Sequence, residues 1–236
     1  MATPKKCEIV LLRHAHSTAN LKGVLAGRDN TVGLSPRGEA EAQQVAQVLA
    51  QGKFDAIYVS DLKRCKQTIA PLLKTTGARP VASKEILEMD YGTWSGKPLS
   101  KLSKMPLWAD IQSRPSTVRF PSGESFAEMS LRANQAVLEM AKGKSRILVV
   151  SHGDVIKSIV AYHLGLPLDN FQRIAIDPAS LTTISYSPSH LISLNNVEHL
   201  QRHSESPKSP KSPKSAKSPK SNQRDIHSLG GGAGRV

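Results

Sequence analysis

The chain is poor in the features that mark disulfide-rich, zinc-stabilised or membrane-spanning proteins. Its 236 residues include only two cysteines, Cys7 and Cys65. They are too few and too far apart for a disulfide framework or a zinc knuckle, and no other cluster of potential ligands stands out. No segment approaches the roughly 20 consecutive apolar residues that a membrane helix needs. We therefore expect a protein without metal, other cofactor or membrane segment.

The N-terminal residues, MATPKK, lack both the apolar region and the cleavage site of a secretory signal. We therefore expect a cytoplasmic location. Hydrophobic residues make up 39% of the chain, which is enough for a core, and the length suits one sizeable domain with a tail.

Positive charge is unevenly distributed along the chain, whose net charge is +13. Residues 201–236 hold eight Lys and Arg against two acidic residues, whereas the first 200 residues hold 24 against 17. This moderate excess in the body suits an anionic small molecule as ligand. From about Gln201 the chain turns to a Ser-Pro-Lys repeat (206–220), which cannot bury a core. We predict one domain over residues 1–200 and a disordered basic tail over residues 201–236.

The Ser-Pro-Lys repeat leaves several interpretations open. A solvated tail, or one that touches acidic surfaces in general, is the usual meaning of a charge run. The repeat also resembles the tails of linker histones, which would give weak, salt-sensitive and nonspecific nucleic-acid binding. No aromatic residues are interleaved for stacking on bases. Proline-directed phosphorylation is a further possibility, at Ser206, Ser209, Ser212 or Ser218.

Strand-like and helix-like segments alternate through the first 200 residues. Short, almost continuously apolar segments typical of parallel strands covered on both faces lie at 8–13, 55–60, 79–83 and 146–151. Amphipathic segments predict helices at 35–51, 60–77, 123–142 and 153–165. Two late strands flanking Pro188, at 181–187 and 191–197, suit a sheet edge. This order predicts an α/β fold, with an open, mostly parallel sheet in three layers and helices on both faces.

Polar and charged residues follow two of the predicted strands where those strands end. Arg13 and His14 close the first of them, and His152 and Gly153 follow the strand at 146–151. In open α/β sheets, ligands bind beyond the carboxyl ends of the strands. The two histidine segments can therefore meet in space, although they lie far apart in the sequence.

Five side chains would together support phosphoryl transfer if the fold brings them to one place. Arg13 and Arg64 offer planar, multi-donor binding to phosphoryl oxygens, and Arg64 lies in the first turn of a predicted helix. A neutral His14 can attack phosphorus, while His152 can stabilise the transferring oxygens. Glu88 can protonate the leaving oxygen and later accept a proton from water. Transfer through histidine needs no metal.

Six segments, in order, resemble the histidine phosphatase superfamily, in its phosphoglycerate-mutase-like branch. They are RHAHSTAN (13–20), GLSPRGEAEA (33–42), YVSDLKRCKQT (58–68), LEMDYGTWSG (87–96), PSGES (121–125) and VVSHGDVIKSI (149–159). The resemblance implies the phosphoglycerate mutase-like fold and a phosphohistidine on His14. It also implies a phosphate pocket of Arg13, Arg64 and His152, with Glu88 as the proton donor.

The same resemblance adds Asn20 and Gly153 as phosphate-binding residues. Ala15 replaces the usual glycine of the family, which is acceptable if its backbone φ is negative. His16 stands where the family usually has Glu, Gln or another polar residue, and we assign it no catalytic role. Asp154 is interpreted as a helix cap rather than a catalyst.

These observations favour a phosphatase that hydrolyses a phosphomonoester of a small phosphorylated metabolite. A second negative group on that substrate could be bound by Arg28, Lys97, Lys101 or Arg119. A phosphomutase is one alternative, but it needs a closed, dry pocket, and the segment between Gly96 and Gly123 is short for a lid. A polyanion- or DNA-binding protein on an inactive phosphatase scaffold is another. The presence of all five key side chains argues against it.

Overall fold

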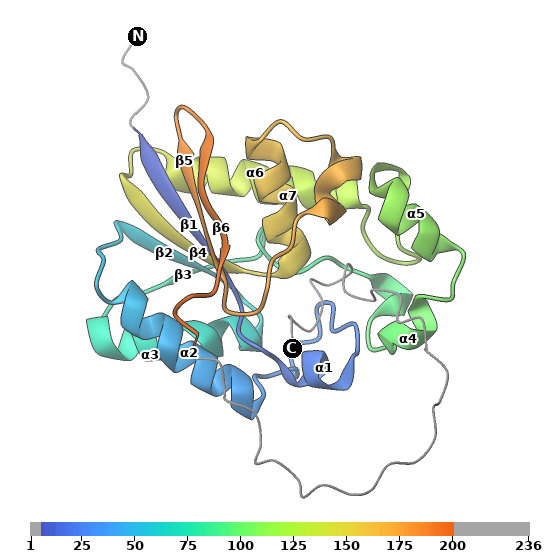
Figure 1. Ribbon diagram of the computed structural model, residues 1–236, viewed down its shortest axis with the longest axis horizontal. Coiled ribbons are helices and arrows are strands. Elements are labelled where there is room, and N and C mark those ends of the chain that lie inside the picture. Colours follow the sequence, from blue (N-terminus) through green and yellow to red (C-terminus); the bar gives the residue numbers. More distant parts are fainter. Residues whose placement is uncertain (1–5, 201–236) are drawn as a thin grey trace, which may run out of the picture.

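The structure, a computed structural model, describes residues 6–200 of the chain. One six-stranded sheet has the order β3-β2-β4-β1-β5-β6 (Figure 1). The strands are β1 (Cys7–Arg13), β2 (Ala56–Ser60), β3 (Val81–Ser83), β4 (Arg146–Ser151), β5 (Leu181–Tyr186) and β6 (His190–Asn196). Strands β1 to β4 are parallel to one another. Strand β5 runs antiparallel to β1, and β6, at the edge of the sheet, runs antiparallel to β5. The predicted mostly parallel sheet is confirmed, and the predicted tail lies outside the described residues.

Four longer helices follow the predicted pattern and alternate with the strands. They are α2 (Pro36–Leu49), α3 (Lys63–Thr76), α6 (Phe126–Ala141) and α7 (Gly153–His163). The shorter helical segments are α1 (Thr18–Lys22), α4 (Leu99–Leu102), α5 (Leu107–Ser113), η1 (Gly92–Trp94), η2 (Pro115–Thr117) and η3 (Leu168–Arg173). Within residues 6–200 we find no helix with the length and apolar character to cross a membrane.

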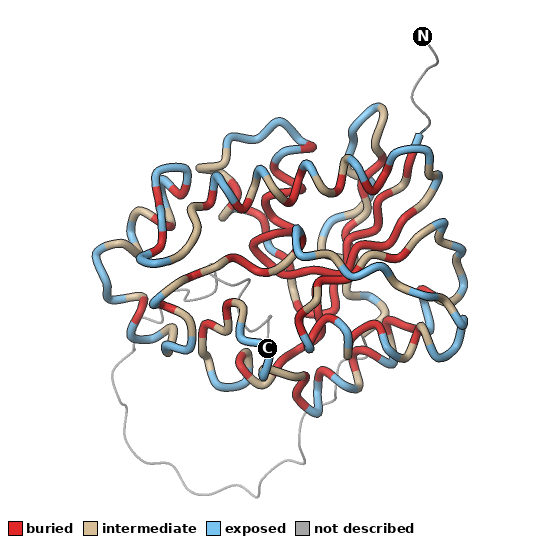
Figure 2. Tube along the Cα trace, turned by 180° about the vertical axis from the view of Figure 1, so that it is seen from behind, coloured by how far each residue is buried: buried red, intermediate tan, exposed pale blue. Residues whose placement is uncertain are grey.

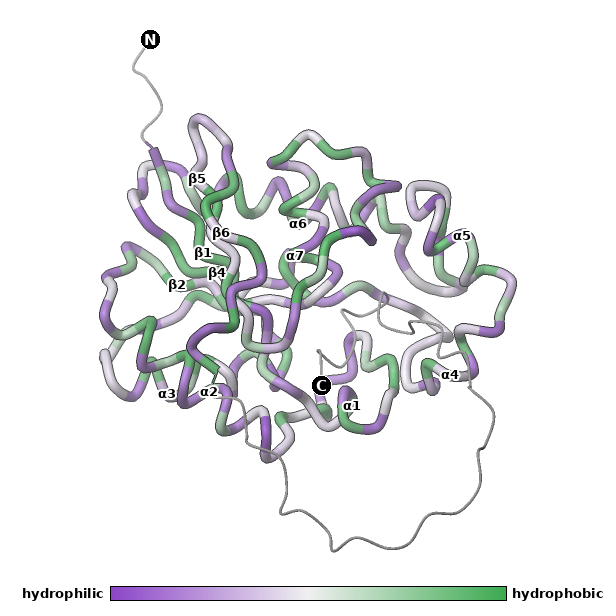
Figure 3. The backbone as a smooth tube through the Cα atoms, viewed as in Figure 1, coloured by the Kyte–Doolittle hydropathy of each residue, from purple (hydrophilic) through white to green (hydrophobic). Residues whose placement is uncertain are grey.

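The sheet is the middle of three layers, with α2 and α3 on one face and α6 and α7 on the other (Figure 1). In β1, Ile9 and Leu11 pack into the cluster that contains α6 and α7, while Val10 and Leu12 pack against α2 and α3. The central strands are buried along most of their length (Figure 2). Burial on both faces explains why their hydrophobicity is nearly continuous rather than alternating (Figure 3).

The carboxyl ends of β1 and β4 lie side by side, which sets the position of the site. Arg13 at the end of β1 is in register with Ser151 at the end of β4. The backbone N–H of His14 donates to the Ser151 carbonyl at 2.9 Å. The segments that leave these two strands therefore start from the same edge of the sheet.

Helix α2 packs closely on the segment that follows β1, and Gly38 makes this approach possible. A Cβ atom at Gly38 would lie 1.9 Å from the carbonyl oxygen of His16. The helix begins as predicted, with Pro36 in its first turn and the Ser35 hydroxyl accepting from the Gly38 N–H at 3.2 Å. This close packing fixes the backbone of the segment that carries His14 and His16.

Candidate active site

Five side chains from four separate segments meet at the carboxyl edge of the sheet. The imidazole rings of His14 and His152 lie 5.2 Å apart between centroids, at an interplanar angle of 59°. Arg64 comes from the first turn of α3, and Glu88 comes from the segment after β3. All five, including Arg13, are at most 4% exposed. The fold therefore assembles the predicted group of side chains, and it does so out of bulk water.

His14 is held in one tautomer by its own backbone neighbour. Its Nδ1 lies 2.8 Å from the carbonyl oxygen of Ala15. A carbonyl oxygen can only accept a hydrogen bond, so Nδ1 carries the proton and Nε2 keeps its lone pair. Burial, with Arg64 and Arg13 nearby, holds the pKa of His14 well below its usual value. The ring is thus neutral, with one nitrogen free to act as a nucleophile.

Backbone carbonyls accept hydrogen bonds from both arginines and orient them. Nη1 of Arg13 donates to the Ile176 carbonyl at 2.7 Å. Arg64 donates from Nη2 to the Gly27 carbonyl at 2.7 Å and from Nη1 to the Asp29 carbonyl at 3.3 Å. Its Nε is buried and has no hydrogen-bond partner among the described residues. Arg64 therefore has a fixed orientation and a spare donor for an anion.

Glu88 has the electrostatics of an acid that titrates near neutral pH. Burial first, and the charge of Asp154 second, raise its pKa to about 7. One carboxyl oxygen accepts from the backbone N–H of Met89 at 2.9 Å, and the other lies 3.9 Å from Nδ1 of His152. A carboxyl group of this pKa can both donate and accept a proton during turnover.

An arginine–glutamate clamp, formed by Arg28, Glu124 and Arg132, holds the segment that carries Glu88. The backbone carbonyl of Glu88 accepts from Nε of Arg28 at 3.0 Å and from Nη2 of Arg132 at 3.2 Å. Both guanidinium groups also pair with Glu124, at 2.9 Å and 2.6 Å. Glu124 lies in the PSGES segment, but its partner Arg28 and the Glu88 segment that the clamp holds are distant in the chain, so the sequence did not indicate this role.

The Glu124→Gln variant is expected to lower the free energy of unfolding by about 1–3 kcal/mol, because two partly buried guanidinium groups lose their counter-charge. Turnover should also fall roughly tenfold as Glu88 becomes less well placed. Urea denaturation and steady-state kinetics measure the two effects. Glu139→Gln removes an exposed carboxylate and is the control, with an expected change within about 0.5 kcal/mol. Equal stability of the two variants would contradict the clamp.

Asp154 belongs to a buried polar network, so its prediction as a helix cap was wrong. His152, not Asp154, occupies the N-cap position of α7, and its side chain makes no capping hydrogen bond. The Asp154 carboxylate instead accepts from the Tyr91 hydroxyl at 2.7 Å and lies 3.4 Å from Nζ of Lys157. Lys157 in turn donates to the side-chain carbonyl of Gln172 at 3.0 Å. These buried neighbours draw Asp154 inward, where its charge raises the pKa of Glu88.

Asn20 and Gly153 lie near the same edge of the sheet in local structural roles. The side-chain oxygen of Asn20 accepts from the backbone N–H of Ser17 at 2.9 Å and from its hydroxyl at 2.7 Å, which completes the cap of α1. Gly153 is the buried first residue of α7. Phosphate binding by either residue stays a prediction.

The two departures from the family's first motif are both accommodated by packing. Ala15 is not among the described residues with positive φ, and its N–H donates to the Thr68 hydroxyl at 2.9 Å. The His16 ring turns toward α2, where its Nδ1 lies 2.8 Å from the Ser35 hydroxyl oxygen. The backbone N–H of His16 donates to the Glu41 carboxylate at 2.8 Å. His16 thus tethers the first histidine segment to α2.

Two of the four basic residues considered for a second substrate charge are engaged elsewhere. Arg28 belongs to the clamp, and Arg119 pairs with Glu128 on the surface. For Lys97 and Lys101 this role stays a prediction.

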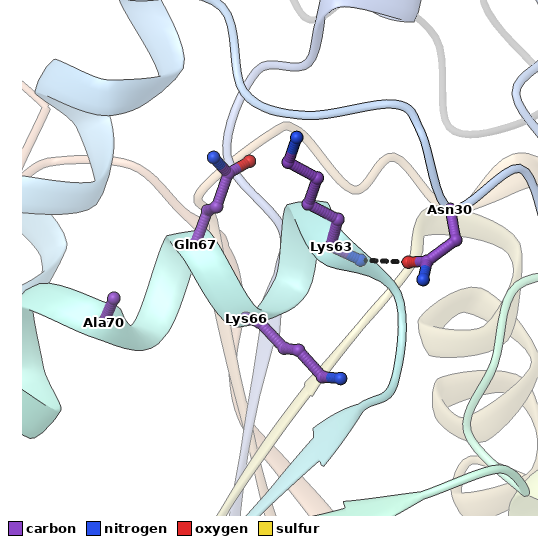
Figure 4. A pocket seen from close by; sticks show the side chains of 5 residues that line it. All are labelled: Asn30, Lys63, Lys66, Gln67 and Ala70. Atoms are coloured by element: carbon purple, nitrogen blue, oxygen red, sulfur yellow. Dashed lines mark hydrogen bonds between the residues drawn. The ribbon is translucent and has the colours of Figure 1, made fainter.

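A separate pocket of about 460 Å³ lies beside the first turns of α3 (Figure 4). Its lining residues are Asn30, Lys63, Lys66, Gln67 and Ala70. The backbone N–H of Lys63 donates to the Asn30 side chain at 2.7 Å, and Lys66 pairs with Asp61 at 2.6 Å. The lining includes none of the five candidate catalytic side chains, so this pocket is not the catalytic site.

Comparison with known proteins agrees with this geometry. The sequence profile of the histidine phosphatase superfamily (branch 1) matches residues 9–197. Phosphoserine phosphatase 1 of Hydrogenobacter thermophilus is 30% identical over 197 residues, covering 80% of this chain and 89% of the relative. A Yersinia enterocolitica protein named "Probable phosphoglycerate mutase GpmB" is 28% identical over 77% of this chain and 86% of its own length.

Solved structures give the same result at the level of the fold. The crystal structure of phosphoserine phosphatase from Entamoeba histolytica, in complex with 3-phosphoglyceric acid, superposes with a TM-score of 0.75 at 26% identity. The match covers 83% of this chain and 100% of that structure. A mycobacterial glucosyl-3-phosphoglycerate phosphatase superposes with a TM-score of 0.72 at 24% identity, over 81% of this chain and 99% of that one. The fold is therefore shared across the matched region.

Proposed function

Since the chain belongs to the histidine phosphatase superfamily (branch 1), we propose that it hydrolyses phosphomonoesters of small metabolites through a phosphohistidine on His14. The observation that carries the proposal is the His14 ring, whose low pKa keeps it neutral and whose Nδ1 proton is directed at the Ala15 carbonyl, so that Nε2 keeps its lone pair. Arg13, Arg64 and His152 lie close to the His14 ring and can donate hydrogen bonds to the phosphoryl oxygens.

The first half of the reaction forms the phospho-enzyme. Nε2 of His14 attacks phosphorus while the ester phosphorus–oxygen bond breaks, and the two guanidinium groups balance the charge on the transferring oxygens. Protonated Glu88 gives its proton to the leaving oxygen, which departs as an alcohol. Asn20 and Gly153 are proposed to add hydrogen bonds to the phosphoryl group.

The second half returns the enzyme to its starting state. Glu88, now a carboxylate, takes a proton from a water molecule as that water attacks the phosphohistidine. The phosphorus–nitrogen bond breaks, inorganic phosphate forms, and Nε2 regains its lone pair. Glu88 has a pKa of about 7, which suits both the acid and the base role near neutral pH.

Hydrolysis and phosphomutase activity share the first half-reaction and differ in the acceptor of the second. Relatives of this chain carry both names. We favour hydrolysis because only short helical segments, α4, α5 and η2, lie between Gly96 and Gly123. The deciding experiment measures phosphate release from phosphoserine and 3-phosphoglycerate beside conversion of 3-phosphoglycerate to 2-phosphoglycerate. Isomerisation without net phosphate release would replace the phosphatase assignment by the mutase.

Turnover is expected to persist in excess EDTA, because every proposed step uses protein side chains. Within residues 6–200, no group of three or more His, Cys, Asp or Glu side chains is arranged to hold a metal ion. Phosphate release, measured with and without EDTA on dialysed protein, should agree within about twofold. Loss of turnover that added Mg²⁺ or Zn²⁺ restores would contradict the metal-independent mechanism.

The remaining expectations extend this proposal beyond the catalytic domain. A cytoplasmic location and weak nucleic-acid or acidic-surface binding by residues 201–236 stay predictions. If the protein hydrolysed none of a broad panel of phosphomonoesters and lost DNA retention on removal of the tail, the inactive-scaffold alternative would replace the phosphatase.

A further inference from the structure

The His152 ring has one edge toward the catalytic site and one toward the protein interior. On the catalytic side, Nδ1 lies 3.9 Å from the Glu88 carboxylate, and the His14 ring lies 5.2 Å away between centroids. On the interior side, Nε2 lies 2.7 Å from the hydroxyl oxygen of Ser60, the last residue of β2. His152 and Ser60 are both fully buried. The Cys65 sulfur lies 3.5 Å from Nε2 and 4.0 Å from Nδ1, so the short contact with the Ser60 hydroxyl is what distinguishes the two ring nitrogens.

The chemistry of the site requires a specific tautomer of this ring. Burial first, and then the nearby Arg64, His14 and Arg13, hold the pKa of His152 well below its usual value, so the ring is neutral. A neutral imidazole has one N–H and one lone pair. Phosphoryl oxygens only accept hydrogen bonds, so His152 can assist the transfer only if Nδ1 carries the proton. Nε2 must then receive a hydrogen bond from the interior.

Ser60 is the group placed to supply that hydrogen bond. A hydroxyl can donate or accept, so the choice depends on the other acceptors around it. The neighbouring Cys65 thiol lies 3.5 Å from Nε2 and donates to the Ser151 carbonyl at 3.6 Å. Burial raises the pKa of Cys65 to about 12, so the sulfur keeps its proton and is a weak acceptor. The imidazole lone pair is the better acceptor for the Ser60 proton.

We propose that the Ser60 hydroxyl donates to Nε2 of His152 and thereby fixes the tautomer with its proton on Nδ1, facing the transferred phosphoryl group. Ser60 is in this sense a positioning residue, which acts on the phosphoryl group only through His152. The catalytic part of this inference rests on the proposed phosphatase function, whereas the tautomer itself is a property of the resting protein.

The first test is made on the resting protein and needs no substrate. In the full-length chain labelled with ¹⁵N-histidine, two-bond ¹⁵N–¹H correlation spectra distinguish protonated from unprotonated ring nitrogens. The His152→Gln variant assigns the signal. We expect Nδ1 of His152 to be protonated and Nε2 to be bare. A proton on Nε2 in the wild-type protein would overturn the inference, whatever the activity.

The second test uses substitutions at Ser60. Ser60→Ala should populate the other tautomer and reduce phosphate release roughly 10- to 100-fold, a loss typical of removing a group that orients a site histidine. Ser60→Thr keeps the hydroxyl and should retain the Nδ1–H tautomer and most of the activity. Ser185→Ala, which removes another fully buried strand hydroxyl, is the matched control and should leave both readouts unchanged.

These measurements separate the two proposals. If the wild-type protein releases no phosphate from any ester while the NMR spectra show the expected tautomers, the phosphatase function fails and the Ser60 assignment holds. If Ser60→Ala keeps both the wild-type tautomer and the wild-type turnover, the Ser60 assignment fails and the phosphatase function holds. Should Ser60→Ala not fold, the wild-type tautomer and the Ser60→Thr variant still decide.

Discussion

Replacing His14 with alanine is expected to abolish the phospho-enzyme and to lower turnover by at least about 10⁴-fold. The variant has no nitrogen at the position of Nε2, so the phosphoryl group has no covalent acceptor. Arg13 and Arg64 remain, and phosphate binding should therefore persist. Rapid quenching after mixing with a ³²P-labelled ester detects the intermediate, which should be labile in acid and stable in alkali, as expected of a phosphorus–nitrogen bond.

The matched control for this variant is His163→Ala. His163 is also a buried histidine, but it is the last residue of α7, at the end away from His152. Its Nδ1 lies 3.0 Å from the Ser189 hydroxyl. Labelling of the His163 variant at the wild-type level, with no label on the His14 variant, is the expected pair of results. Label on His14→Ala equal to that of the wild type would place the intermediate on another residue.

Replacing Glu88 with glutamine is expected to reduce hydrolysis of alkyl phosphates by about 10²- to 10⁴-fold. Hydrolysis of p-nitrophenyl phosphate should fall far less, because nitrophenolate leaves without first taking a proton. The pH dependence follows from the raised pKa of about 7. The protonated carboxyl is the active acid, so kcat/KM for alkyl phosphates should fall as pH rises through about 7, and the variant should lack this step.

Glu85→Gln is the control for that experiment, because Glu85 is an exposed carboxylate on the same segment. Its turnover and pH profile should match those of the wild-type protein. Equal losses of Glu88→Gln on both kinds of substrate would show that Glu88 does not protonate the leaving group. Steady-state rates with the two substrates between pH 5 and 9, in one set of buffers, make the comparison.

Much of the fold could be predicted from local sequence patterns because burial on two faces leaves a direct mark. Strands such as β4 are apolar along nearly their whole length, and helices such as α2 carry their own start signals at Ser35 and Pro36. The meeting of His14 with His152 also followed from topology, since parallel neighbouring strands end at one edge.

The residues that support the site could not be predicted in the same way. Glu124 holds the acid segment through Arg28 and Arg132, each of which is also compatible with a surface or substrate-binding role in the sequence. Asp154 looked like a helix cap because its position after a strand fits one. Its partners, Tyr91 and Lys157, become visible only in the packed structure. Such pairings depend on three-dimensional packing, which local patterns do not encode.

The central place of β1 has a consequence for how the protein is made. This first strand pairs with β4 on one side and with β5 on the other, both of which emerge from the ribosome much later. During synthesis both backbone edges of β1 stay unpaired until β4 and β5 are made, and an unpaired strand edge exposes a nascent chain to aggregation and to chaperones. Pairings of such long sequence separation also form slowly. The active site should therefore form in one late step, after β5 has been translated and has paired with β1.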